Sequence, residues 1–201
     1  AANGCEYACT VTSDTDQPDD ASLDANCDGL DGESNKAVFV SPGGSDRSDG
    51  VTRVSPVRSI ARGIEIAAAT GRTQVLVAVG TYTGSTLALS GGVGLYGGYA
   101  ADFLSRSTSR SIFNATTAVA MDVTGLTQAT VVDRMTLTSA DQTEAGVESV
   151  GVRVSSSGNF LSIRNSLIWA GQGGNGASGS AGGSGTNGTA GVQGGGTAVP
   201  L

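Results

Sequence analysis

The sequence contains no histidine, a single lysine and few aromatic residues among its 201 residues. The lack of histidine excludes Ser-His-Asp and Cys-His catalytic triads and the histidine-containing zinc motifs of hydrolases. Basic residues are also outnumbered, since 18 acidic and 11 basic residues give a formal net charge of −7. Nucleic-acid and anionic-membrane partners are therefore not expected, because phosphate binding needs clustered Lys and Arg.

Long hydrophobic runs are missing as well. No stretch approaches the roughly 18 consecutive apolar residues of a transmembrane segment, and the N-terminus lacks the basic-then-apolar pattern of a signal peptide. We therefore expect a soluble chain whose export signal was removed or lies upstream. Branched aliphatic residues are scarce at both ends. The sequence thus predicts an acidic head (1–36), a core (37–170) and a glycine-rich tail (171–201).

The three cysteines, Cys5, Cys9 and Cys27, all lie in the head, where no packed core would otherwise hold the chain. This placement predicts disulfide bonding outside the reducing cytosol. Three single-bridge pairings are possible. The odd count leaves one cysteine free, paired with another chain, or paired with a segment outside this sequence.

Residues 24–33 carry oxygen-bearing side chains at loop positions 1, 3 and 5, followed by glycine at position 6. This is the first half of a calcium-binding loop, in which alternate residues face the cation and glycine makes the turn. The pattern departs from an EF-hand because position 12 is Asn35 and no amphipathic helix flanks the loop. The predicted calcium ligands are Asp24, Asn26, Asp28, the carbonyl of Leu30, Asp31 and Glu33. A second group, Asp14, Asp16, Asp19 and Asp20, either binds another ion or stays solvated.

The head as a whole, from Asn3-Gly-Cys-Glu-Tyr-Ala-Cys9 through Asp24 to Glu33, resembles the Asp- and Cys-rich metal-binding segments that precede the globular parts of large secreted bacterial proteins. This resemblance implies calcium rather than zinc, in agreement with the preference of the harder ion for carboxylate oxygen.

The core contains a repeat of 31 residues. Residues 118–123 align with 149–154 at this shift, and the same shift sets Asp122 over Arg153 and Asp133 over Arg164. Residues on successive turns of a coiled parallel sheet would lie about 4.8 Å apart. We therefore expect the two Asp/Arg pairs to form outward ladders. The apolar residues Val119, Met121, Val123 and Val132 should stack inward on Val150, Val152, Val154 and Ile163.

Hydrophobic patterning predicts a strand at 37–42, a helix at about 57–70 that ends at Gly71, a strand at 73–79, and short strands from Leu87 onward. One helix before many short strands excludes a βαβ sheet. A β-sandwich built as a meander is possible, but it gives no reason for a 31-residue period, whereas a solenoid does.

Four segments carry a second resemblance: Val38-Phe-Val-Ser-Pro-Gly-Gly-Ser-Asp46, Ser55-Pro-Val-Arg-Ser-Ile60, Val77-Ala-Val-Gly-Thr-Tyr82 and Gly94-Leu-Tyr-Gly-Gly-Tyr99. Together they are similar to the opening of secreted pectate-lyase-like right-handed β-helix proteins. The resemblance implies an all-β fold, a right-handed parallel β-helix (solenoid) whose N-terminal end is plugged by a short capping helix. Function is left open, because this scaffold carries lyases, hydrolases, adhesins and passenger domains.

Catalysis on such a scaffold would need stacked carboxylates, whereas each Asp of the repeat stacks on an Arg. We therefore expect structural ladders and no catalytic residues. Asp46 and Asp49 lie in a Gly/Ser loop, where carboxylates usually accept hydrogen bonds from their own backbone. Trp169 is expected to cover the core, although an aromatic sugar-binding platform is the alternative.

Glycine occupies every third position from Gly173 to Gly194. Strict spacing of this kind is typical of an extended helix with three residues per turn that packs against neighbouring chains. The run contains no proline, so a polyglycine-II-like tail is expected in preference to a collagen triple helix. A disordered spacer is the alternative.

These features together predict a non-catalytic structural or adhesive protein, secreted or on a bacterial cell surface and stabilised by calcium. We expect it to self-associate into an assembly or filament through its solenoid ends and tail, and surface glycans are a further candidate partner. The alternative is a polysaccharide lyase or a carbohydrate-binding module that acts on acidic glycans. A third possibility is the N-terminal piece of a larger passenger domain.

Overall fold

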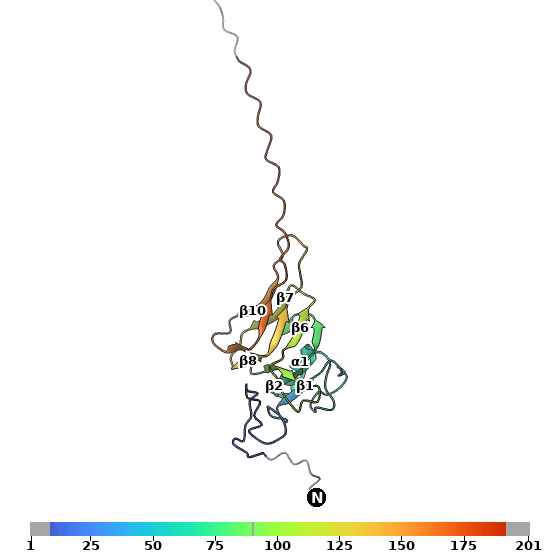
Figure 1. The fold of residues 1–201 in the computed structure, drawn as a ribbon. Coiled ribbons are helices and arrows are strands. Elements are labelled where there is room, and N and C mark those ends of the chain that lie inside the picture. The colour runs from blue at the N-terminus through green and yellow to red at the C-terminus, as the bar shows by residue number, and fades with distance from the viewer. Residues whose placement is uncertain (1–8, 90, 192–201) are drawn as a thin grey trace, which may run out of the picture.

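The computed structural model describes residues 9–89 and 91–191, which contain one helix and twelve strands (Figure 1). No helix in these residues is long and apolar enough to cross a membrane. The helix is α1 (Ile60–Thr70). The strands are β1 (Ala37–Val40), β2 (Gln74–Ala78), β3 (Thr81–Gly84), β4 (Leu87–Ala88), β5 (Gly94–Tyr99), β6 (Ser111–Ala115), β7 (Val119–Thr124), β8 (Thr130–Asp133), β9 (Met135–Thr138), β10 (Val150–Ser155), β11 (Leu161–Arg164) and β12 (Leu167–Trp169).

The strands form three parallel sheets that the chain visits in turn. One sheet has the order β1-β2-β5-β8-β11, the second β3-β6-β9-β12 and the third β4-β7-β10. From β2 the chain passes to β3, then to β4, and returns to the first sheet at β5, and this order continues to β12. The described chain is therefore mostly β with parallel sheets, as expected.

The 31-residue register is confirmed by the strand pairs at the C-terminal side of all three sheets. Arg153 pairs with Asp122 in β10 and β7, Arg164 with Asp133 in β11 and β8, and Ile168 with Leu137 in β12 and β9. The same spacing recurs in side-chain hydrogen bonds. The hydroxyls of Thr86 and Thr117 lie 2.9 Å apart, and those of Thr124 and Ser155 lie 3.0 Å apart.

Two corners of the chain repeat at the same interval. The residue after β8, Arg134, and its counterpart after β11, Asn165, have φ of 53° and 49°. Gly125 after β7 and Ser156 after β10 have φ of 67° and 50°. Left-handed backbone costs a non-glycine residue roughly 1–2 kcal/mol. Its recurrence 31 residues apart indicates that the corners are dictated by the stacking of the sheets.

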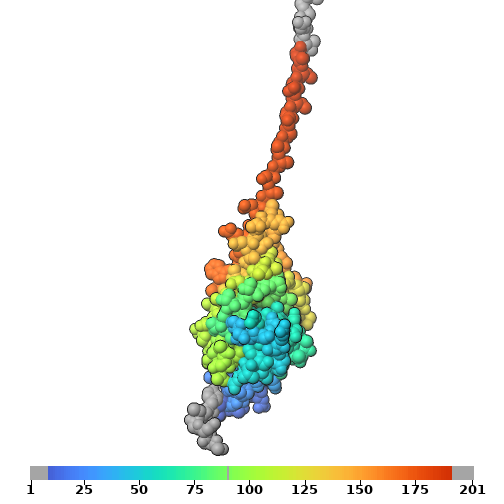
Figure 2. Space-filling view, turned by 90° about the vertical axis from the view of Figure 1, so that its right-hand side faces the viewer, coloured from blue at the N-terminus to red at the C-terminus, as the bar shows by residue number. Residues whose placement is uncertain are grey.

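We call the three sheets together the stack, because each turn of the chain lies on the previous one. Helix α1 closes the end of the stack that contains the first strands, β1, β3 and β4. Ser59 caps its N-terminus by accepting a hydrogen bond from the amide of Arg62, and Gly71 ends it with φ of 70°, as predicted. Its buried face packs on β1, β2 and β4. Gly63 is required there, because a Cβ would lie 2.6 Å from a methyl group of Val40. Figure 2 looks onto this closed end, with α1 in the middle of the face.

Loop 41–59 closes the free edge of β1 at the same end. The amide of Phe39 donates to the carbonyl of Gly50 over 2.8 Å, and the Phe39 carbonyl accepts from the amide of Val57 over 2.9 Å. Asp49 in this loop accepts from the amide of Val51, as predicted for a turn carboxylate, whereas Asp46 accepts from the more distant amides of Arg58 and Ser59. The first strand therefore presents no open edge along this segment.

The opposite end of the stack is open. Val123 is fully buried, whereas Val154, one turn later, is 49% exposed; Leu137 is fully buried, whereas Ile168 is 44% exposed. The predicted inward stacking is therefore present, but no part of the chain within residues 9–89 and 91–191 covers the last turn. Trp169 is 58% exposed, so the prediction that it covers the core is wrong. In β12 the inward-facing residue is Ile168, which pairs with the buried Leu137. Trp169 is the next residue and faces outward, like its register partner Thr138, which is half-buried.

The glycine-rich tail leaves the stack as an extended chain, drawn in red in Figure 1. Its first residues lie along loop 140–147, where the Gly174 amide donates to the Val147 carbonyl over 2.8 Å. Beyond this point, a Cβ added at any of the glycines from Gly176 to Gly191 would meet nothing within 4 Å. The polyglycine-II-like packing stays a prediction, and Gly194 lies outside the described residues.

Candidate functional site

The head, taken here as residues 9–36, lies along the outer face of the five-stranded sheet. Three strands of that sheet contact it. Gln74 in β2 donates to the carbonyl of Asp16 over 2.8 Å, the Tyr96 hydroxyl in β5 donates to Gln17 over 3.1 Å, and Arg164 in β11 donates to the carbonyl of Pro18 over 3.4 Å. The head therefore spans the sheet from its second strand to its last.

The head and the sheet share a small apolar cluster. Its buried members are Leu30 from the head, Ala37, Phe39, Leu76, Ala78, Tyr96 and Tyr99 from the sheet, and Phe103 from the loop after β5. The rings of Phe39 and Phe103 meet edge to face with centroids 5.0 Å apart, a favourable geometry. Burial of Leu30 in this cluster fixes the position of the predicted calcium loop on the sheet.

A disulfide joins Cys9 and Cys27. It is one of the three pairings that the sequence allowed, and it encloses most of the head. Cys5 lies outside the described residues, so its state stays a prediction. The bridge closes residues 9–27 into a loop and anchors the start of the predicted calcium loop at Cys27.

The first three predicted calcium ligands lie together. Asp24 accepts from the amides of Asp28 and Gly29 over 3.0 and 2.8 Å, and Asn26 accepts from the same Asp28 amide over 3.0 Å. Asp28 in turn accepts from the side chain of Asn26 and from the amide of Ser34. Gly29 makes the predicted turn with φ of 85°. The three side chains thus form one compact polar loop.

Asp31 and Glu33 are turned away from that loop and toward the sheet. Asp31 accepts from the amide of Asp19 over 3.1 Å, and its carbonyl accepts from the Tyr99 hydroxyl. Glu33 forms a 2.9 Å ion pair with Lys36. Both carboxylates therefore have protein partners, and within the described residues no group of three or more acidic, Cys or His side chains is arranged to hold a metal. The oxygen donors suit calcium by type, and calcium binding stays a prediction.

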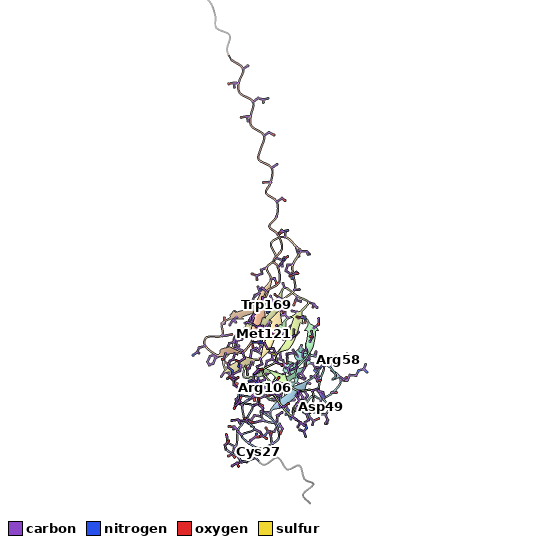
Figure 3. All side chains as sticks on the ribbon, in the orientation of Figure 1. Cys27, Asp49, Arg58, Arg106, Met121 and Trp169 are labelled. Atoms are coloured by element: carbon purple, nitrogen blue, oxygen red, sulfur yellow. A yellow bond between two sulfur atoms is a disulfide. The ribbon has the colours of Figure 1, made fainter. Side chains whose placement is uncertain are left out.

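A fully buried arginine, Arg106, joins the head to the sheet. Its guanidinium lies 2.7 Å from Asp133 and 3.7 Å from Asp31, and it donates to the carbonyls of Gly97 and Asp19 over 2.9 and 3.1 Å. It also stacks over the rings of Tyr96 and Tyr99 at 5.7 and 5.3 Å. Figure 3 shows Arg106 between the strands and the part of the head that contains Cys27.

Asp133 is completely buried, so the expectation that it forms an exposed ladder with Arg164 is wrong in part. Arg164 does lie 3.6 Å from it, but Arg106 is nearer and Asn165 donates to its other oxygen over 2.9 Å. The head covers this face of the sheet, which places the carboxylate out of water. The other predicted pair, Asp122 and Arg153, is partly exposed with 3.8 Å between charged atoms, as expected.

Burial raises the pKa of the Tyr99 hydroxyl and of the Asp31 carboxyl in this cluster. Burial raises the pKa of Asp31 to about 6, against the opposing effects of the Asp19 amide and the Arg106 charge. One carboxylate oxygen, Oδ2, is buried and has no hydrogen-bond donor in range within the described residues. In the part of the chain that the structure describes, the negative charge on Oδ2 is therefore balanced by Arg106, whose guanidinium lies 3.7 Å from it, farther than the 2.7 Å that separate Arg106 from Asp133.

A shallow cleft of about 370 Å³ lies between the head and the loop after β5. Its walls are Ser22, Asp24, Gly29, Leu30, Asp31, Leu104, Ser105 and Arg106. Two predicted calcium ligands, Asp24 and Asp31, therefore border the same space. Arg106 also borders it and places a positive charge beside Asp31, which opposes cation binding on that side.

Sequence reasoning missed Arg106. It lies in a Ser-rich segment without hydrophobic periodicity, and its partners Asp31 and Asp133 are 75 and 27 residues away in sequence. The one available signal was the pair of tyrosines at 96 and 99, whose large polar-tipped rings need partners when buried.

Comparisons with known proteins gave no match to any family model, any curated protein or any solved structure. The functional interpretation therefore depends on the chain's own sequence and geometry.

Proposed function

We propose that this chain is a non-catalytic structural or adhesive protein, built as a right-handed parallel β-helix, that acts by self-association at a cell surface or outside the cell. The observation that carries the proposal is the open end of the stack, where the turn formed by β10, β11 and β12 leaves Val154, Ile168 and Trp169 partly exposed. Monomeric soluble proteins rarely expose contiguous apolar patches of this kind without a partner. Unpaired strand edges at the same place favour association as well.

The β-helix part of the proposal is supported by the visiting order of the three sheets and by the 31-residue register. A chain that returns to the same sheet once per turn, beside its previous strand, buries a continuous apolar interior. The main apolar cluster runs through this interior from Val38 and Val40 in β1 to Leu137 in β9.

The absence of a catalytic role is proposed from the surroundings of the carboxylates. Asp122 lies beside Arg153, Asp133 beside Arg106, and Asp46 accepts from backbone amides. Glycan lyases and hydrolases need carboxylates that are free to transfer protons or hold a metal on one face. Neutralisation by arginine favours a structural role for each of these groups.

Calcium binding by the head is the second part of the proposal. Asp24, Asn26 and Asp28 would supply side-chain oxygens and Leu30 its carbonyl, with the Cys9–Cys27 disulfide holding the loop closed. Asp31 and Glu33 would join only by leaving their partners Asp19 and Lys36. Calcium bound here would stabilise the head on the sheet.

Calorimetric titration with calcium chloride tests this part directly. The wild-type chain should bind calcium and unfold at a higher temperature in its presence. Asp28→Asn should weaken binding at least about tenfold because it removes one charged ligand. Glu65→Gln, which changes an exposed carboxylate on α1 outside the head, is the matched control and should bind as wild type. Equal calcium affinity in the two variants, or no binding at all, would contradict the calcium proposal.

The same preparation separates the structural role from the enzymatic alternative. Incubation with acidic polysaccharides and calcium should release no unsaturated sugars, which would be detected by their ultraviolet absorbance. Calcium-dependent release of such sugars would overturn the non-catalytic proposal and support a polysaccharide lyase.

A further inference from the structure

The open end of the stack is a defined apolar face. We use the name "open end" for the exposed sides of β10, β11 and β12. The inward-facing apolar residues of this turn lie over buried partners of the preceding turn: Val152 over Met121, Val154 over Val123, Ile163 over Val132 and Ile168 over Leu137. The partners are all fully buried, so the exposure of the last row is due only to the missing cover.

The segment that follows in the chain does not supply this cover. Residues 170–191 contain no Val, Leu, Ile, Met or aromatic residue and are half-buried or exposed throughout. They also run away from the stack as an extended chain (Figure 1). Residues 170–191 therefore leave the row of aliphatic residues at the open end uncovered.

The opposite end of the stack does not fit that partner role. It is closed by the buried face of α1, and the edge of β1 is hydrogen-bonded to loop 41–59. Its most exposed large apolar side chain is Val54, 88% exposed, in the turn before α1. An open end of one copy would meet the polar outer face of α1, which carries Arg62 and Glu65, and an occupied β1 edge on the closed end of another. Head-to-tail growth of a filament is therefore disfavoured.

Charge favours a meeting between two open ends. The chain carries a net charge of −7, which makes two copies repel over most of their surfaces. Residues 139–169, which contain the last turn, hold two arginines and three acids and are nearly balanced. Arg153 already pairs with Glu148 over 2.6 Å at the rim. A surface with both signs can be complementary to itself.

Strand direction is compatible with the same arrangement. A two-fold axis across the stacking direction turns the edge strands of one copy antiparallel to those of the other, and antiparallel edges can exchange backbone hydrogen bonds. The tail would not obstruct this contact, because it projects in the plane of the turns beyond β10 (Figure 1).

We propose that the open end binds the open end of a second copy, giving a closed, two-fold dimer and no filament. This inference deepens the proposed function and rests on it. Each interface residue then occurs twice, once from each copy, so a single substitution acts at two places in the dimer.

Sedimentation velocity of the full chain over a range of concentrations tests the inference. Wild type should reach the mass of two copies and stay there as concentration rises. Val154→Lys should weaken dimerisation by roughly 100-fold, about tenfold for each of the two lysines brought into the interface. Val54→Lys makes the same change at the closed end and should dimerise as wild type. Circular dichroism and thermal unfolding establish that both variants are folded.

The outcomes are distinguishable. Assemblies that keep growing, or a dimer that Val154→Lys leaves intact while truncation before Gly173 abolishes it, would overturn the closed dimer but leave self-association standing. A wild-type monomer at every concentration would overturn both. A dimer that Val154→Lys disrupts, together with sugar-releasing activity, would keep the dimer and contradict the non-catalytic role.

Discussion

Arg106 carries more of the contact between head and sheet than any residue that was predicted to matter. Its charge is shared by Asp133 and Asp31, and its remaining donors reach two backbone carbonyls, one in β5 and one in the head. Such a buried network stabilises a fold only as a complete set, because removal of one member leaves an uncompensated charge. The head is therefore held by electrostatics as well as by its apolar cluster.

Arg106→Ala should lower the free energy of unfolding by about 3–5 kcal/mol, because it leaves Asp133 buried without its main partner. Arg62→Ala removes an exposed arginine that pairs with Glu65 on α1 and should cost about 0.2–0.5 kcal/mol. Urea unfolding followed by circular dichroism measures both. A loss below about 1 kcal/mol for Arg106→Ala would show that the network contributes little.

Asp31 should make stability depend on pH. Its pKa is raised from 3.8 to about 6 in the folded chain, so the folded state holds its proton more tightly than the unfolded state. The stability that this proton supplies is fully present below about pH 4 and is lost as pH rises through 6. Asp31→Asn cannot ionise and escapes this loss, which amounts to about 3 kcal/mol.

Thermal unfolding in chelator-containing buffer between pH 4 and pH 8 measures this difference. Relative to wild type, Asp31→Asn should gain stability between pH 4 and about pH 6 and then level off toward pH 8, whatever its constant offset from the change of side chain. A difference between the two proteins that does not vary with pH would show that Asp31 titrates normally.

At the scale of elements, strand periodicity and caps were readable from the sequence because they depend on local chemistry. The 31-residue shift correctly placed Asp122 beside Arg153. The end of α1 at Gly71 was also predicted, although the helix, capped by Ser59, begins three residues later than the predicted residue 57. The burial of Asp133 was not readable, because it depends on a head that returns across the sheet from over 100 residues away. Trp169 was misplaced because an uncovered last turn has no signature in local hydrophobicity.

The open end also sets a gradient of stability along the stack. Val123 and Val154 are the same residue type in register one turn apart, the first fully buried and the second 49% exposed. Val123→Ala should cost about 1–3 kcal/mol in unfolding free energy, whereas Val154→Ala should cost below about 0.5 kcal/mol in dilute, monomeric solution. Urea unfolding of both variants at low concentration checks this. Equal losses would indicate that the last turn is covered within a single copy.

At the scale of the whole molecule, the chain is an asymmetric stack. One end is closed by α1 and loop 41–59, one face is covered by the disulfide-bonded head, and the other end is open. Figure 1 shows residues 9–36 and residues 171–191 on opposite sides of the sheets, so both segments lie beside the stack and leave the open end uncovered. The proposed association depends on this asymmetry, because it leaves one end of the stack uncovered within the described residues.

Amide hydrogen exchange as a function of protein concentration tests the account most directly, because it reports on the open end itself. The account predicts that amides on the free edges of β10, β11 and β12 exchange freely in dilute solution and become protected as concentration rises. Amides of the head and of α1 should exchange at the same rate throughout. Exchange at β10–β12 that is unchanged by concentration, or protection that appears at α1 instead, would contradict association through the open end.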